Sequence, residues 1–186
     1  MLFNNEQKLS FITSLIIFFC LTIAYAKPYY GANFSYPLVT KEPPSLHGYQ
    51  FMLTYDPETI HWEKWLYVYF DGGFSHFWIT NKPYYTTLNI YSIAPVVRMM
   101  LQQKEKVSLF IDFSIGAAYL NHIYLDNRKL GIHFAFQDRI GVGLLFGTSQ
   151  QFILGLHAIH YSNAHLSKHN SGITIPVMLD VGYRFQ

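Results

Sequence analysis

A histidine and a serine stand two positions apart in the segment His160-Tyr161-Ser162-Asn163-Ala164. The segment ends a run of residues, 152–164, whose apolar composition is typical of a membrane strand. Residues i and i+2 of a strand project from the same face, so His160 and Ser162 are expected side by side. A histidine that accepts the proton of a neighbouring hydroxyl turns that hydroxyl into a nucleophile. The pair therefore supplies two members of a hydrolase triad.

The same strand face carries the apolar residues Leu154, Leu156 and Ala158 before the pair. If this face meets lipid, the two polar residues lie at the edge of the bilayer. A hydrogen bond between them would there reduce the cost of removing them from water. The spacing alone leaves two interpretations open. The pair is either a nucleophile with its base, or two polar residues that mark where the strand leaves the membrane.

The composition favours a membrane protein built from strands. Hydrophobic residues make up 51% of the chain and aromatic residues 18%, whereas 13% are charged. Average globular proteins carry about 25% charged residues. After residue 26 no apolar stretch reaches the ~20 residues of a membrane helix. These features predict an all-β fold, namely an eight-stranded antiparallel transmembrane β-barrel of the outer membrane.

Two alternatives are weaker. A soluble β-barrel or sandwich should have polar outward strand faces, whereas many outward positions here are Leu, Ile, Phe, Tyr or Val. The net charge of +2 gives no reason to expect nucleic acid as a partner.

Residues 1–26 are expected to be a cleaved signal peptide, which leaves a barrel domain over residues 27–186. Lys8 precedes an apolar run at residues 11–23, and Ala24-Tyr25-Ala26 matches the small-x-small pattern of a cleavage site. The alternative is an uncleaved N-terminal anchor, for which the apolar run is short. The single cysteine, Cys20, lies inside this segment, so the barrel domain can form neither a disulfide nor a thiolate zinc site.

Eight strand-like runs separated by turn-prone residues are expected at 29–40, 46–55, 61–74, 87–103, 107–120, 130–146, 151–164 and 173–185. In the last run, the odd-numbered residues from Ile173 to Phe185 suit lipid. The even-numbered residues, which include Asp180 and Arg184, suit a polar interior that holds ion pairs. Pro176 cannot donate to a strand ladder, and a bulge there would reverse this alternation.

The segment from His160 to Ala164, followed by Asn170, Gly172 and a final strand, resembles the lipid A 3-O-deacylase family. This is the PagL-like group, whose members are often labelled acyloxyacyl hydrolases. Residues 134–143 and 93–98 are also similar to strands of that family. The resemblance implies a serine esterase with no metal and no cofactor. Its substrate would be the ester-linked acyl chain at position 3 of lipid A, in the lipopolysaccharide of the outer membrane.

Residue by residue, the resemblance implies that Ser162 is the nucleophile and His160 the general base. It associates Asn163 and Asn170 with the active site, where they would hold the oxyanion or shape the turn. The position of the family's orienting acid is occupied by Thr174, which can form a hydrogen bond with His160 but carries no charge.

The missing acid leaves three outcomes open. Thr174 orients the histidine by itself, another carboxylate such as Asp138 or Asp180 takes the role, or catalysis is lost. In the last case the chain would be a non-catalytic small barrel that binds lipid A or stabilises the membrane. The simplest use of Asp138 is an interior ion pair with Arg98 or Arg139.

Four histidines near the pair, His157, His160, His165 and His169, do not have the spacing of a metal site, and a location at the barrel rim is expected for them. The sequence leaves open whether the barrel, surrounded by outer-membrane lipids, also forms a homodimer.

Overall fold

The computed structural model describes residues 28–80 and 85–185, so the expected signal peptide lies outside the described residues. Eight long strands make up most of the described chain: β1 (Tyr29–Val39), β2 (Leu46–Asp56), β4 (Leu66–Ile79), β5 (Thr87–Gln103), β6 (Val107–Leu120), β9 (Phe134–Phe146), β10 (Phe152–Ser162) and β11 (Ile173–Phe185). Three short strands lie in the connections between them: β3 (His61–Glu63), β7 (Tyr124–Leu125) and β8 (Arg128–Lys129).

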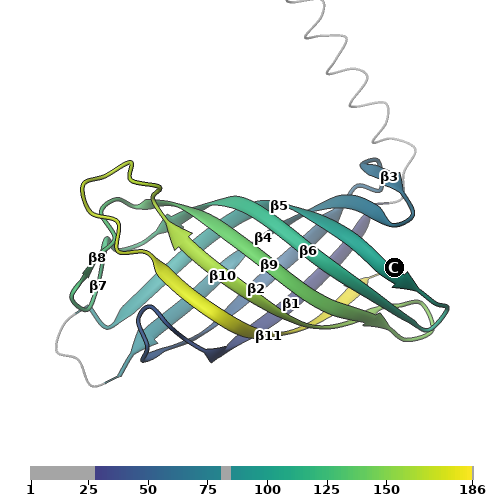
Figure 1. Cartoon of the computed structure of the whole chain (residues 1–186), viewed down its shortest axis with the longest axis horizontal. Helices are drawn as coiled ribbons and strands as arrows, with labels where there is room; N and C mark the ends of the chain where they lie inside the picture. Colours follow the sequence, from purple (N-terminus) through teal and green to yellow (C-terminus); the bar gives the residue numbers. More distant parts are fainter. Residues whose placement is uncertain (1–27, 81–84, 186) are drawn as a thin grey trace, which may run out of the picture.

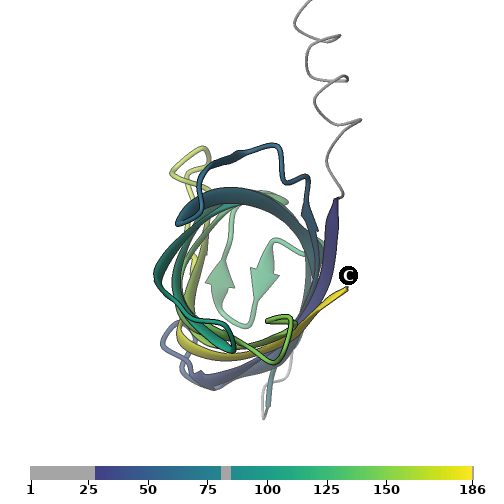
Figure 2. The ribbon, with the colours of Figure 1, turned by 90° about the vertical axis from the view of Figure 1, so that its right-hand side faces the viewer.

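The long strands pair antiparallel in the order β2-β1-β11-β10-β9-β6-β5-β4, and pairing of β4 with β2 closes the sheet into a barrel (Figures 1 and 2). Closure gives each of the eight long strands a partner on both sides, which is what a sheet needs in a solvent that cannot hydrogen-bond its backbone. The predicted eight-stranded antiparallel barrel is confirmed. No helix in the described part of the chain is long and apolar enough to cross a membrane.

Most predicted strand boundaries agree with the structure, with two exceptions. The run expected at 61–74 is divided into short β3 and longer β4, which continues to Ile79. The run expected at 130–146 begins only at Phe134, because the residues before it belong to the connection that contains the β7–β8 hairpin.

The two ends of the barrel differ in the length of their connections. The connections at 121–133 and 163–172 extend from one end, at the left of Figure 1, whereas β5–β6 and β9–β10 are joined by short turns at the other end. Outer-membrane barrels have short periplasmic turns and longer extracellular loops. We call the end with the long connections the outer rim. The β7–β8 hairpin lies across the opening at this rim (Figure 2), and its Leu125 is buried against the barrel core.

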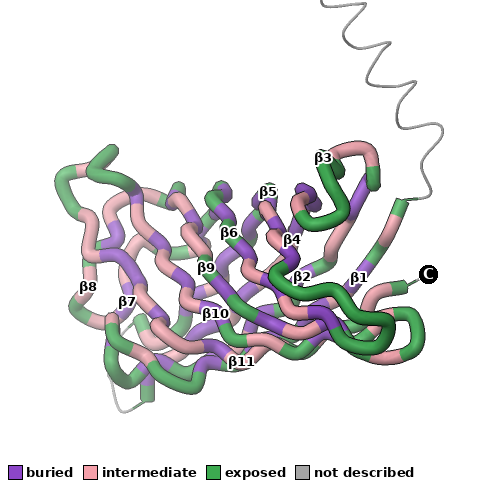
Figure 3. The backbone as a smooth tube through the Cα atoms, turned by 45° about the vertical axis from the view of Figure 1, so that its right-hand side comes forward, coloured by how far each residue is buried: buried purple, intermediate pink, exposed green. Residues whose placement is uncertain are grey.

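Exposure alternates along the strands between an apolar outer face and a mixed inner face (Figure 3). Large apolar side chains on the outer face include Ile93, Ile115 and Val142, which are 50–67% exposed. Such a band of exposed apolar residues suits contact with hydrocarbon rather than water.

A bulge in β11 changes which residues face the interior. His157 of β10 pairs with Met178, but Ile159 pairs with Ile175, so Pro176 and Val177 together oppose a single residue of β10. Proline lacks the N–H that a regular ladder would need, and an extra residue reverses the alternation beyond it.

The bulge corrects the expected faces of the last strand. Ile173 and Ile175 were expected toward lipid, but both are fully buried inside the barrel. Thr174 lies on the opposite face from these two residues and therefore points outward. Beyond the bulge the expected alternation holds, since Val181 and Tyr183 are exposed.

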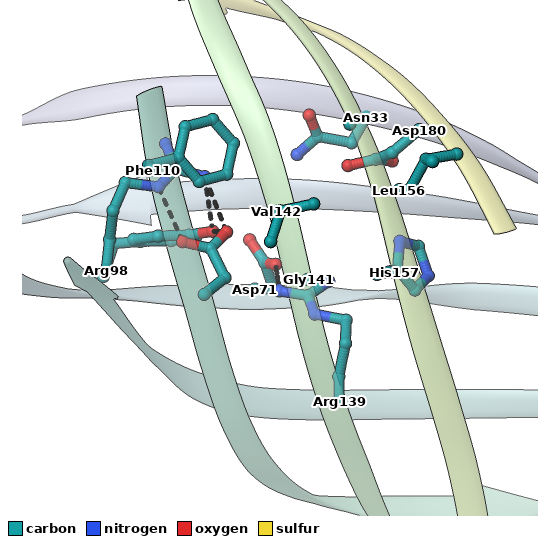
Figure 4. A pocket seen from close by; sticks show the side chains of 13 residues that line it. Asn33, Asp71, Arg98, Phe110, Arg139, Gly141, Val142, Leu156, His157 and Asp180 are labelled. Carbon is teal, nitrogen blue, oxygen red and sulfur yellow. Dashed lines mark hydrogen bonds and ion pairs between the residues drawn. The ribbon is translucent and has the colours of Figure 1, made fainter. Parts of the chain in front are cut away.

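The barrel interior is filled partly by paired charges (Figure 4). The Arg98 guanidinium donates to both carboxylate oxygens of Asp112, at 2.8 and 2.7 Å. Arg139 donates to Asp71 at 2.6 Å. The expected pairing of Asp138 with either arginine is therefore wrong, because both arginines have other partners and Asp138 lies on the outward face of β9.

Asp180 and Arg184 lie on the inner face of β11 as expected, but they interact with neutral groups. Asp180 accepts a hydrogen bond of 2.7 Å from the Ser35 hydroxyl. The Arg184 guanidinium stacks over the Tyr29 ring at 3.9 Å from its centroid. The interior charges thus use hydroxyls and rings as well as ion pairs.

Removing one member of an interior ion pair should destabilise the barrel. Arg139→Met leaves Asp71 buried and unpaired, which is expected to lower the free energy of unfolding by about 3–5 kcal/mol. Urea unfolding in detergent micelles, followed by tryptophan fluorescence, measures the change. Arg139→Met with Asp71→Leu should recover most of the loss. A loss no larger than that of the exposed Lys106→Met would contradict the expectation.

Candidate active site

One row of residues runs across the barrel wall at the level of His160. Asp138 of β9 pairs with Ile115 of β6 on one side and with His160 of β10 on the other. His160 pairs with Thr174 of β11, and an antiparallel bridge joins Thr174 to Glu42 in the β1–β2 connection. Side chains of directly opposed residues lie on the same face. The row therefore brings two carboxylates, a hydroxyl and an imidazole to the outside of the barrel.

His160 is held through the ring nitrogen that faces β11. Its Nδ1 lies 2.9 Å from Thr174 Oγ1, and the Thr174 hydroxyl donates to Glu42 Oε2 at 3.3 Å. A hydroxyl has one proton, so a Thr174 that donates to Glu42 accepts from the Nδ1–H of His160. This arrangement leaves a free lone pair on His160 Nε2, which is the form that a general base requires.

Ser162 lies on the same outward face as His160, at the last position of β10. It pairs with Phe136 of β9 and lines a small hollow together with Gly172. No hydrogen bond joins Ser162 Oγ to His160 in the described residues. Hydrogen bonds between catalytic groups are often unmade without substrate, and rotation about the serine Cα–Cβ bond moves Oγ among three staggered positions.

Gly172 gives the imidazole its space. Its φ of +54° lies in the left-handed region, where a residue with a Cβ is disfavoured by about 1–2 kcal/mol. A Cβ at this position would lie 3.1 Å from His160 Cε1 and 3.2 Å from the Tyr161 carbonyl oxygen. The Cε1–Nε2 edge of the ring therefore packs against the glycine that shares a hollow with Ser162.

Asn163 and Asn170 tie the β10–β11 connection to the barrel. The Asn163 side chain is buried and donates its amide hydrogens to the carbonyls of Leu130 and His169, at 2.8 and 2.7 Å. Its backbone N–H donates to Asn170 Oδ1 at 2.9 Å. Of the two roles expected for Asn163, its geometry fits the shaping of the turn. Asn170 lines the same hollow as Ser162.

Glu42 is fixed beside Thr174 by its backbone and by an arginine. The Glu42 N–H donates to the Thr174 carbonyl at 3.1 Å, and the Thr174 N–H donates to the Glu42 carbonyl at 2.9 Å. Arg128 of β8 lies 3.7 Å from Glu42 Oε2 and also donates to the carbonyls of Ser171 and Gly172. The hairpin at the outer rim thus links the carboxylate to the turn beside the serine.

An apolar groove adjoins His160 on the outer surface of the barrel. It crosses β6, β9 and β10, and its lining includes Phe113, Ile115, Ile140 and Ala158. The small side chain of Ala158 opposes Ile140 in register and forms a low point between larger neighbours. The groove leads along the lipid-facing wall to the imidazole.

Sequence reasoning missed Glu42. It is 132 residues from Thr174 in the chain. Its only visible signal was its place at the start of the turn-forming segment Glu42-Pro43-Pro44. The expected rim location of His157 is also wrong, because this residue is buried inside the barrel. Among residues 28–80 and 85–185, no three His, Cys, Asp or Glu side chains are grouped so as to hold a metal ion.

The fold and the site together define a small β-barrel of the outer-membrane type with a serine–histidine pair on its outward face. A family model described as lipid A 3-O-deacylase (PagL) matches residues 29–184. The chain belongs to this family. The crystal structure of the outer membrane enzyme PagL is 25% identical in sequence, with a TM-score of 0.62, and the match covers 83% of this chain and 98% of that one.

Curated relatives match over a shorter segment. The lipid A deacylase PagL of Pseudomonas aeruginosa is 41% identical over 69 residues, which are 37% of this chain and 39% of that protein. The Bordetella bronchiseptica lipid A deacylase PagL is 34% identical over 76 residues, 41% of each chain. The matched segments thus span about two fifths of the curated relatives. Neisserial surface protein A, at 12% identity and a TM-score of 0.50, shares the fold.

The buried amide of Asn163 is expected to anchor the β10–β11 connection. Asn163→Ala removes the amide that donates to the Leu130 and His169 carbonyls. Each buried carbonyl left without a hydrogen bond lowers the stability of the connection by about 1–3 kcal/mol. Trypsin should then cut faster after the exposed Lys168, as followed by mass spectrometry of the fragments. Asn127→Ala, at an exposed position of the same rim, is the control. Equal cleavage rates for wild type and Asn163→Ala would contradict an anchoring role.

Proposed function

We propose that this chain is an outer-membrane serine esterase that removes the ester-linked acyl chain at position 3 of lipid A. Family membership supports the substrate and the reaction class. The observation that carries the proposal is the hydrogen bond from His160 Nδ1 to Thr174, because it leaves Nε2 free as a base beside Ser162. A homodimer stays a prediction.

The proposed reaction is acyl transfer to Ser162. His160 Nε2 accepts the serine proton while Oγ attacks the ester carbonyl carbon, which forms a tetrahedral oxyanion. The protonated imidazole then donates to the departing sugar 3-oxygen as the ester C–O bond breaks. A water molecule, deprotonated by the same nitrogen, attacks the acyl-serine. The imidazolium then returns the proton to Ser162 Oγ as the bond to the acyl group breaks and the fatty acid leaves. Both proton abstractions, from Ser162 and from water, use the neutral Nδ1–H form that the contact with Thr174 favours.

Asn170 is the proposed oxyanion donor. It lines the hollow that contains Ser162, and its Oδ1 accepts the Asn163 backbone N–H. This bond turns the amide so that Nδ2 is left as a donor, and no hydrogen bond of Nδ2 occurs in the described part of the chain. A preorganised amide directed at developing negative charge lowers the barrier of acyl transfer.

The position of the site supports a substrate that is already in the membrane. His160 and Ser162 lie on the outward face near the outer rim, at the end of an apolar wall. The groove beside His160 is lined by exposed apolar side chains such as Ile115, Ile140 and Phe113. An acyl chain can lie in this groove without leaving its apolar surroundings, so little desolvation opposes binding.

Ser162→Ala should abolish acyl removal while leaving the barrel folded, because it removes the nucleophile alone. The rate is expected to fall by about 10³-fold or more, as losses of a nucleophile in hydrolases do. The measurement is mass spectrometry of lipid A from a Gram-negative host that expresses each variant, together with the fatty acid released. Ser45→Ala, an exposed serine at the same rim, is the control. Identical lipid A profiles for wild type and Ser162→Ala would remove Ser162 from the mechanism, and intact lipid A with wild type would favour a non-catalytic barrel.

Filling the groove should weaken the reaction with long acyl chains. Ala158→Trp places a large ring next to His160, where it crowds the bound acyl chain. If this crowding raises the activation free energy by about 1–3 kcal/mol, kcat/KM falls roughly 5- to 150-fold. A short-chain ester should be affected less, because it occupies less of the groove. Leu154→Trp, on the same face but farther along β10, is the control. Equal losses with long and short chains would argue against the groove as the acyl site.

A further inference from the structure

We propose that Glu42 supplies the missing charge of the triad through Thr174, as a positioning residue rather than a catalytic one. The inference rests on the proposed esterase function. Two contacts carry it, His160 Nδ1 to Thr174 Oγ1 at 2.9 Å and the Thr174 hydroxyl to Glu42 Oε2 at 3.3 Å. The Thr174 hydroxyl thus lies between the carboxylate and the imidazole, which are bonded directly in an ordinary triad.

Glu42 decides the direction of the hydrogen bond at His160. A threonine hydroxyl without another partner could donate its proton to Nδ1, which would leave the ring proton on Nε2 and remove the base. A carboxylate accepts hydrogen bonds and donates none when ionised, so it draws the Thr174 proton to itself. Thr174 must then accept from Nδ1–H. The negative charge also stabilises the imidazolium that forms when His160 takes the serine proton.

The position of Glu42 is built into the fold. Its backbone forms two hydrogen bonds with Thr174, so the two side chains project from the same face of a bridge. Arg128 lies 3.7 Å from the carboxylate and donates a hydrogen bond to the carbonyl of Gly172. Gly172 is also the residue against which the imidazole of His160 packs. One arginine therefore holds both the charge and the turn next to the base.

Asp138 is the competing carboxylate, because it is the neighbour of His160 on β9. The ring nitrogen that the acid of a triad must contact is already bonded to Thr174 on the opposite side. No hydrogen bond between Asp138 and His160 occurs in residues 28–80 and 85–185. Asp180 is excluded by its place, since it faces the barrel interior and accepts from Ser35. Glu42 is thus the carboxylate that the hydrogen bonds connect to the base.

The test is a double-mutant cycle between Glu42 and Thr174, measured as kcat and KM on purified lipid A in detergent micelles. Glu42→Gln keeps the size of the side chain but removes the charge. We expect kcat to fall about 10- to 100-fold with KM little changed, less than the ~10⁴-fold seen when an acid bonded directly to histidine is neutralised. Thr174→Val should lower kcat similarly, and the double variant should be no worse than either single change.

The second arm restores a carboxylate next to the base. In Thr174→Glu the new carboxylate contacts His160 without a relay, so adding Glu42→Gln to this variant should have little effect on kcat or raise it. A merely structural Glu42 would instead cause the same loss in both backgrounds, which would overturn the proposal. Glu105→Gln, at the opposite end of the barrel, is the control for loss of an exposed carboxylate.

Two further outcomes separate this proposal from the esterase function itself. Unchanged kcat in Glu42→Gln, together with an inactive Ser162→Ala, would overturn the role of Glu42 and keep the esterase. A large loss of kcat in Asp138→Asn with none in Glu42→Gln would assign the charge that supports His160 to Asp138 of β9. That result would also overturn the role of Glu42. Activity that survives in Ser162→Ala would instead contradict the proposed esterase mechanism.

Discussion

The structure depends on one constraint, which is that every backbone N–H and C=O within a bilayer must find a partner in the protein. Eight long strands meet it by closing into a barrel in which β4 pairs with β2. Closure in turn fixes an inside and an outside for each residue. Charged residues such as Arg98 and Arg139 are accommodated inside only because Asp112 and Asp71 pair with them there. The outside is left for apolar residues and for the site.

Polar groups on the outward face are costly unless they bond to one another, and His160, Thr174 and Glu42 do so in a single row. The imidazole of His160 bonds to Thr174, Thr174 bonds to Glu42, and Arg128 lies 3.7 Å from the carboxylate at the rim. Ser162 stands at the end of β10, where the strand reaches the outer rim. A water-requiring hydrolysis of a membrane-embedded ester needs both lipid and water at one point.

Much of the fold and part of the site could be predicted from the sequence, for physical reasons. Strand parity placed His160 and Ser162 on one outward face, and composition predicted the closed barrel. The inner and outer faces at Ile173 and Thr174 could not be predicted. The extra residue of the bulge at Pro176 reverses the alternation, and the sequence pattern does not show where a bulge occurs. Glu42 was missed because its contact joins opposite ends of the chain. Asp138 was assigned to the interior because an ion pair with Arg98 or Arg139 was its simplest use, but strand pairing places it on the outward face beside His160.

The bridge between Glu42 and Thr174 lies beside the seam where the first strand, β1, meets the last strand, β11. This seam joins the two long strands that lie farthest apart in the sequence, residues 29–39 and 173–185. Glu42 therefore reaches Thr174 only where β1 and β11 are paired. Without this pairing, His160 and Ser162 would still lie on one face of β10, but the hydrogen bond between Thr174 and Glu42 would be missing. One strand pairing thus completes both the barrel wall and the hydrogen-bonded row at the site.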